Sequence, residues 1–157
     1  MASYTGVVKS NFVKGPLPFH LPTPDGVHPN LAKYWTTIYA VELTGYSAIG
    51  TDDYTYSVFV ADRALVVDAC FLTDPTGLSV GNINYNTMTL KNASTTMCSA
   101  TTAYGIVAGL PMEIARYTTL AERTLAAGDE VTFKITGTVS GRVINHETKV
   151  YVVCHKI

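Results

Sequence analysis

Residues 121–139 read Ala-Glu-Arg-Thr-Leu-Ala-Ala-Gly-Asp-Glu-Val-Thr-Phe-Lys-Ile-Thr-Gly-Thr-Val, and this stretch decides the fold. A Gly128-Asp129 turn is followed by strict alternation of apolar and polar side chains. Alternation with a period of two predicts a β-strand with one buried face. The inward side chains would be those of Val131, Phe133 and Ile135, and the outward ones those of Thr132, Lys134 and Thr136.

Short β patterns of this kind run from residue 36 almost to the C-terminus, and turn residues such as Asp74-Pro75-Thr76-Gly77 separate them. No helical pattern long enough for a βαβ crossover lies between them, so we expect antiparallel sheets. The sequence therefore predicts an all-β protein, an antiparallel β-sandwich, with region 111–125 extended rather than a short helix. The predicted strands span residues 36–43, 54–61, 64–72, 83–91, 101–108, 130–139 and 148–155.

The composition limits the classes of partner. The 157 residues fit one domain that needs neither a disulfide nor a metal. Only 15% of residues are charged and 47% are hydrophobic, so Thr, Ser, Asn and Tyr must cover much of the surface, as is common where proteins meet proteins. The formal charge of −1 and the lack of a basic stripe predict no nucleic-acid partner.

Cellular location is predicted from the cysteines and the apolar runs. The sequence has an odd number of cysteines, and they lack CxxC spacing, which predicts buried free thiols. These are Cys70, Cys98 and Cys154. The N-terminus shows no basic region followed by an apolar core, so we expect synthesis and folding in a cytoplasm. The apolar runs at 64–72 and 104–112 are too short to span a bilayer, so no membrane partner is expected.

Five of the seven prolines lie within residues 1–35, a density that excludes a regular helix or a central strand there. We therefore divide the chain into an extended N-terminal arm, residues 1–35, and a β-sandwich domain, residues 36–157. The arm is apolar, whereas solvated linkers are usually polar, so we expect it to lie against its own domain, a sister subunit or a different partner. The predicted partner-binding residues of the arm are Phe12, Val13, Leu17, Phe19, Leu21 and Trp35.

No pattern in the sequence is typical of catalysis. The four histidines show no metal-ligand spacing, and a metal enzyme would need His146, Glu147 and His155 to converge. A serine-nucleophile elbow and a Gly-rich phosphate loop are both missing from the sequence. Asp62 and Asp68 flank an apolar run and are expected at turns or at the rim of the sandwich. We therefore predict that the protein is not an enzyme and takes no metal or cofactor.

The candidates for surface recognition outside the arm are the acidic pair Asp52-Asp53 and the tyrosines at positions 46, 54, 56, 85, 104 and 117. Tyr54 and Tyr56 share a face of their predicted strand, and Asp52 and Asp53 precede it in a loop. Tyr offers a flat apolar body with a polar tip, which suits protein or sugar surfaces. The alternative is that these tyrosines reflect ordinary strand propensity.

Three segments resemble small jelly-roll virion proteins of tailed bacteriophages: Val-Phe-Val-Ala-Asp-Arg-Ala-Leu-Val-Val-Asp-Ala-Cys-Phe-Leu at 58–72, Asn-Thr-Met-Thr-Leu-Lys-Asn at 86–92 and Leu-Ala-Ala-Gly-Asp-Glu-Val-Thr-Phe at 125–133. The resemblance covers roughly residues 55–155. It consists of strand and turn patterns and includes no catalytic signature.

This resemblance implies a capsid decoration (cement) protein, or a related head or tail structural protein, which is often a homotrimer. Such a protein is made in the host cytoplasm and lies on the capsid surface of the virion. It would bind the major capsid protein or other virion proteins at capsomer junctions through its β-sandwich and its arm, which would bury Phe12, Leu17 and Phe19. The alternative is a tail or fibre module that binds a receptor or a carbohydrate.

Overall fold

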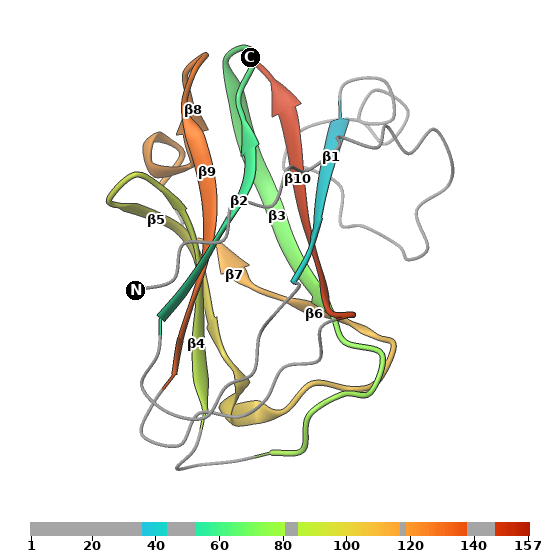
Figure 1. Ribbon diagram of the computed structural model, residues 1–157. Coiled ribbons are helices and arrows are strands. Elements are labelled where there is room, and N and C mark those ends of the chain that lie inside the picture. Colours follow the sequence, from blue (N-terminus) through green and yellow to red (C-terminus); the bar gives the residue numbers. More distant parts are fainter. Residues whose placement is uncertain (1–35, 44–52, 81–84, 117–118, 138–146) are drawn as a thin grey trace.

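The computed structural model describes residues 36–43, 53–80, 85–116, 119–137 and 147–157 (Figure 1). Two antiparallel sheets pack face to face in this part of the chain, which confirms the predicted all-β sandwich. The described residues contain no α-helix, and their only helical turns are η1 (Thr102–Tyr104) and η2 (Ala121–Arg123). Residues 1–35, which hold the predicted arm and all six of its predicted partner-binding residues, lie outside the described residues.

Within the described ranges, each sheet contains five strands. Sheet A has the order β1 (Thr36–Glu42), β10 (Lys149–Lys156), β3 (Leu65–Thr73) and β6 (Pro111–Glu113), and β8 (Thr124–Leu125) also pairs with β3. Sheet B has the order β2 (Asp53–Val60), β9 (Glu130–Gly137), β4 (Asn86–Asn92), β5 (Thr95–Thr101) and β7 (Ala115–Arg116).

The strand pairs are nested around the turn between β4 and β5. Strand β4 pairs with β5, β3 with β6, β2 with β9, and β1 with β10. This is one long hairpin rolled into two sheets, the arrangement of a jelly roll. The described strands therefore have the jelly-roll-like topology that the resemblance implies.

The facing sides of the two sheets form the main core. Val131, Phe133 and Ile135 are all fully buried, so the face predicted for this strand is correct. At the edge of the sandwich, the rings of Tyr39 on β1 and Phe59 on β2 stack with centroids 3.7 Å apart and join the sheets.

The three cysteines are free and buried, which confirms that prediction. Burial raises the pKa of the Cys98 thiol to about 12, and it also raises the pKa values of Cys70 and Cys154. A thiol needs to lose its proton to react, so these groups behave as small apolar side chains at neutral pH.

One predicted strand is misplaced. The sequence predicts a strand at 101–108, whereas β5 ends at Thr101 and the chain then turns through η1. The cause lies in the hairpin: Asn92 pairs with Thr95, so a two-residue turn at Ala93-Ser94 starts β5 six residues earlier than predicted. In region 111–125 the chain forms the short strands β6, β7 and β8 with η2 between them, in agreement with a mainly extended path.

Ala93 adopts a φ of 50°, the only positive φ of a non-glycine residue in the described part of the chain. Glycine takes this conformation without the steric cost that Cβ brings. We expect Ala93→Gly to raise the free energy of unfolding by about 0.5–1 kcal/mol, measured by urea denaturation. Ala40→Gly is the matched control, since Ala40 is exposed on β1, where glycine should destabilise the strand. Equal destabilisation by both substitutions would contradict this account of the turn.

Candidate interaction surface

The tyrosines predicted to form a recognition surface belong to the interior. Tyr56 is 6% exposed and lies in the main core, and Tyr54 is half-buried and packs against it. The prediction of a surface role for Tyr56 is therefore wrong. The strand face that carries both tyrosines also carries Val58, which is fully buried, so this face points into the sandwich.

Asp53 is exposed at the start of β2, but its carboxylate already has a partner on the neighbouring strand. Asp53 Oδ2 lies 2.6 Å from Lys134 Nζ. The hydrogen bond from Lys134 lowers the pKa of the Asp53 carboxyl below its usual value. Asp52 lies outside the described residues. Of the other three, Asp53 points outward and Tyr54 and Tyr56 point toward the core.

Asp68 was expected at a turn or rim, and this prediction is wrong. It lies within β3, 6% exposed, where the register with β10 shifts: Val153 pairs with Ala69 and Cys154 with Val67. Asp68 is therefore the extra residue of a β-bulge, which alternation cannot reveal.

The bulge is enclosed by polar contacts. His155 Nδ1 lies 2.7 Å from Asp68 Oδ2, Arg116 Nη1 donates to the Asp68 carbonyl, and Arg123 Nη1 donates to the Val67 carbonyl, the last two at 2.8 Å.

The metal enzyme considered from sequence would need Glu147 and His155 to converge. Glu147 precedes β10 and His155 lies near its end, so the strand separates them. The third residue of that set, His146, lies outside the described residues. In the described ranges, no group of three His, Cys, Asp or Glu residues is placed to hold a metal ion.

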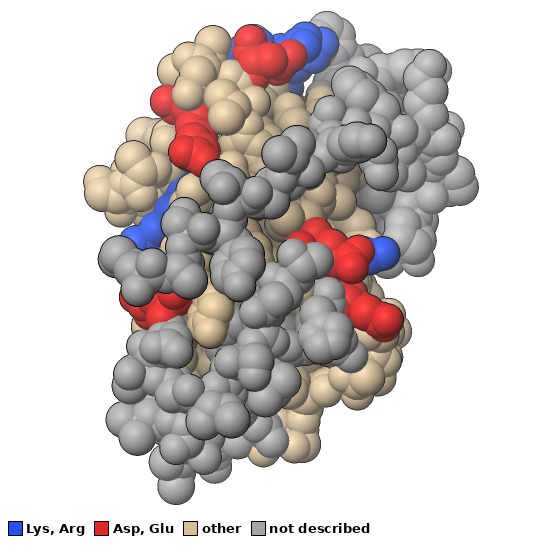
Figure 2. Space-filling view, viewed as in Figure 1, with Lys and Arg blue, Asp and Glu red and all other residues tan. Residues whose placement is uncertain are grey.

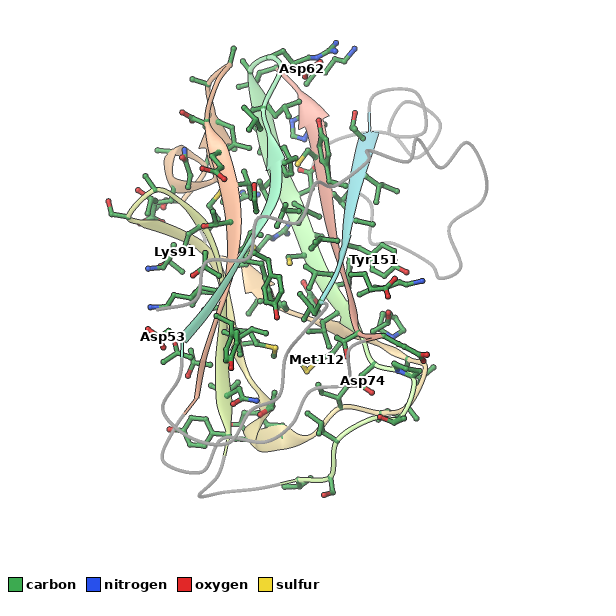
Figure 3. The ribbon with its side chains drawn as sticks, viewed as in Figure 1. Asp53, Asp62, Asp74, Lys91, Met112 and Tyr151 are labelled. Atoms are coloured by element: carbon green, nitrogen blue, oxygen red, sulfur yellow. The ribbon has the colours of Figure 1, made fainter. Side chains whose placement is uncertain are left out.

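A buried carboxylate organises the loops at the lower end of the sandwich (Figure 3). Asp74 follows β3 and is fully buried. Its Oδ1 accepts hydrogen bonds from the N–H of Thr76 and of Gly77, both at 2.8 Å, and Oδ2 accepts one from the hydroxyl of Thr148, also at 2.8 Å. The Asp74 carbonyl accepts from the N–H of Gly109 at 2.8 Å. One residue thus ties together the turn after β3, the approach to β10 and the loop before β6.

Beyond Asp74, two loops interlock in a short antiparallel bridge. The N–H of Leu78 donates to the Ile106 carbonyl and the N–H of Ile106 to the Leu78 carbonyl, each at 2.8 Å. Gly77 has a φ of 69°, and a Cβ there would lie 2.6 Å from the Ile106 oxygen. Gly105 has a φ of 78°, and its Cβ would lie 2.8 Å from the Leu78 oxygen. Glycine is therefore required on both sides of the bridge.

Large apolar side chains are exposed on and beside this bridge. Tyr104 is 87% exposed, and the others are between 58% and 67% exposed. Exposed apolar side chains that gather in one place are typical of sites where proteins bind proteins. We call this set the loop patch: Val80, Tyr104, Val107 and Leu110.

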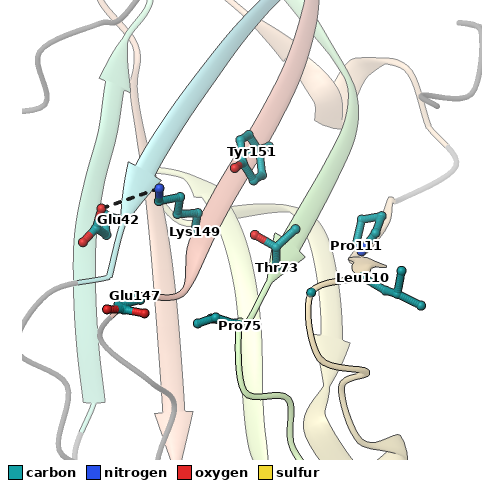
Figure 4. A pocket seen from close by; sticks show the side chains of 9 residues that line it. Glu42, Thr73, Pro75, Leu110, Pro111, Glu147, Lys149 and Tyr151 are labelled. Carbon is teal, nitrogen blue, oxygen red and sulfur yellow. Dashed lines mark ion pairs between the residues drawn. The ribbon is translucent and has the colours of Figure 1, made fainter. Parts of the chain in front are cut away.

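A depression of about 610 Å³ borders the loop patch, and Leu110 belongs to both (Figure 4). Tyr151 and Thr73 of sheet A line it, and so do Glu42 and Lys149, whose Oε2 and Nζ atoms lie 4.0 Å apart (Figure 4). The pair is half exposed, so it is well screened by water and contributes little to stability. The remaining lining residues are Pro75, Gly109, Pro111 and Glu147.

Three charged residues, Glu42, Glu147 and Lys149, line the depression. On the face shown in Figure 2, acidic and basic side chains of the described residues lie in small separate groups. No helix of the described part of the chain is long and apolar enough to cross a membrane. No protein-family model matches the chain, and no curated protein sequence is significantly similar to it.

The sequence singled out Tyr104 as one of six candidate surface tyrosines but did not predict the other residues of the loop patch. Residues 104–108 were assigned to a strand, which hides the exposure of Tyr104 and Val107. A usable signal is the placement of Gly77, Gly105 and Gly109, because glycines between apolar residues at this spacing indicate turns rather than a strand.

The Asp74 contacts predict a pH-dependent stability. Burial raises the pKa of the Asp74 carboxyl, but the hydrogen bonds from Thr148, Thr76 and Gly77 outweigh this effect, and the net pKa lies below its usual value. We expect Asp74→Asn to lower the free energy of unfolding at pH 7 by about 1–3 kcal/mol, because a charged acceptor makes the stronger hydrogen bonds.

Because the folded-state pKa is depressed, the carboxylate stabilises the fold fully above about pH 4 and loses this effect as pH falls through the folded-state pKa. The difference between wild type and Asp74→Asn should therefore shrink as the pH falls below about 4, measured by urea denaturation. Asp62→Asn is the control, since Asp62 is exposed and should change stability little. A difference that does not vary with pH would contradict the assignment.

Proposed function

We propose that this protein is a structural component of a virion that decorates and stabilises a bacteriophage capsid, binding at capsomer junctions through its β-sandwich and N-terminal arm. The observation that supports this proposal most directly is the loop patch, led by Tyr104. Aromatic side chains in the centre of an interface commonly account for much of the binding energy.

The backbone beneath the patch favours tight binding. Gly77 and Gly105 pack against the opposite loop with no room for a Cβ, and Asp74 fixes both loops to the end of the sandwich. A surface held in this way loses little conformational freedom when it docks. The jelly-roll topology adds an analogy at the level of the fold, because viral capsid proteins and lectins share it.

The first test is the copy number of the chain in particles from its native source, measured by quantitative mass spectrometry of density-gradient fractions. Under the proposal, the chain co-migrates with DNA-filled shells in a number comparable to that of the main shell protein. A few copies per particle would instead indicate a tail or fibre component, and absence from particles would overturn a structural role.

A second prediction concerns the loop patch. The double variant Tyr104→Ser, Val107→Ser removes two exposed apolar side chains whose burial would contribute about 3 kcal/mol together, or about 100-fold in Kd. We expect its copy number in purified particles to fall at least tenfold. Val60→Ser is the matched control, because Val60 is also exposed but lies on β2, away from the patch. Equal copy numbers per particle for the wild type, the double variant and Val60→Ser would show that the patch does not attach the protein.

The alternative function, a tail or fibre module that binds a carbohydrate or a receptor, is favoured by one feature, the depression beside the patch. It places the ring of Tyr151 near the carboxylates of Glu42 and Glu147, and an aromatic ring with nearby carboxylates can bind sugar rings and their hydroxyls. The test is binding of the protein to host-surface glycans. Loss of binding in Tyr151→Ala, with unchanged binding in the double variant Tyr104→Ser, Val107→Ser, would support this function over decoration.

A further inference from the structure

The outward face of sheet A carries an apolar cluster of its own. We call it the outer strip, and it is separated from the main core by the sheet itself. Three of its side chains are almost fully buried, at 3% for Val153, 4% for Ala69 and 6% for Phe71. The members of the outer strip are Ala69, Phe71 and Val153, with the partly buried Ile38 and Tyr151 packed against them.

The strand register makes the strip continuous. Ile38 on β1 lies opposite Val153 on β10, which lies opposite Ala69 on β3. In the next outward row, Tyr151 lies opposite Phe71. The strip therefore runs across three neighbouring strands and over two successive rows of outward side chains.

The strip lacks a second layer among the described residues. The main core combines side chains from both sheets, whereas every member of the outer strip comes from sheet A. A phenylalanine on the open face of a sheet would be exposed to water, yet Phe71 is 6% exposed. The other members of the strip come from the same sheet, so they lie beside Phe71 rather than over it.

The N-terminal segment has the right position and length to be that layer. It joins the sandwich at Thr36, two residues before Ile38, so it enters at the end of the strip. The fifteen residue steps from Leu21 to Thr36 can span about 50 Å, whereas an eight-residue strand is about 27 Å long. The chain can therefore return over the whole face of sheet A.

The two longer internal segments outside the described residues suit the strip less well. Residues 44–52 follow β1, and residues 138–146 precede β10, so both join sheet A at its Glu42–Lys149 end. That end carries a polar row that borders the depression. The strip begins in the next outward row, at Tyr151, which also lines the depression, and runs from there toward Thr36.

We propose that Phe12, Leu17 and Phe19 pack on the outer strip of the same chain, so that the N-terminal segment forms a third layer of its own domain. Pro16 and Pro18 lack N–H donors, so the contact is made by side chains on a sheet face rather than by adding a strand to an edge. The covalent link supplies a local concentration of about millimolar order, which favours docking within one chain over docking on a neighbour.

This proposal concerns the isolated full-length protein. It differs from the proposed function in one respect, because it places Phe12, Leu17 and Phe19 on the chain's own domain rather than at the contact with a capsid. The test replaces Tyr151 by the photoreactive benzoylphenylalanine, which keeps an aromatic side chain beside the strip. Irradiation should link it to peptides of residues 1–35 in a product with the mass of one chain. Tyr104 carries the same group in the control and should give no such product, since it is exposed in the loop patch. Cross-links to residues 1–35 found only in dimers, or no cross-links to that segment, would overturn the proposal.

A second measurement uses substitutions in the arm of the full-length chain. The triple variant Phe12→Ser, Leu17→Ser, Phe19→Ser should unfold at a lower temperature than the wild type. It should also bind more of a hydrophobic dye, because the outer strip loses its cover. Val60→Ser, which removes an exposed apolar side chain from sheet B, is the control and should change neither quantity. An unchanged midpoint and unchanged dye binding in the triple variant would also overturn the proposal.

Discussion

Strand β3 is buried from Leu65 to Leu72, so this strand must be covered on both faces. Antiparallel strands more often pack one face on a core and leave the other in water. The inner face of β3 is covered by sheet B, and its outer face carries Ala69 and Phe71 of the outer strip. A two-layer sandwich covers only one of these faces. The requirement for a further layer is therefore built into the sequence of β3 itself.

Along one edge of β3, side chains as well as strands supply the hydrogen-bond partners of the backbone. It pairs with β8 at Leu65 and Val66 and with β6 from Phe71 to Thr73, and the stretch between them has no strand partner on that side among the described residues. Arg123 and Arg116 donate to the carbonyls of Val67 and Asp68 there. Buried carbonyls need partners, so these two arginines close an edge that the crossing from β6 to β7 would otherwise leave open.

How far the sequence predicts the fold depends on how regular each strand is. Strand β9 alternates cleanly, and its faces were predicted correctly. Strand β5 was missed because Ala93 holds a positive φ that glycine normally signals, and because Met97 and Cys98 are both buried beside a register shift. Alternation also fails at the bulge that holds Asp68, and the exposure of Tyr104 depends on a bridge between loops that are distant in sequence.

The two apolar surfaces differ in what holds them. The loop patch lies on a backbone fixed by Asp74 and by two interlocked glycines, and its side chains stay in water, led by Tyr104 at 87% exposure. The outer strip is a sheet face whose side chains are buried or half-buried. A covered surface contributes to the stability of the domain, whereas a rigid exposed one has its apolar area still to bury. If the arm covers its own sheet, contact with a neighbouring protein falls mainly to the loop patch, and attachment should then depend more on Tyr104 than on Phe12 or Phe19.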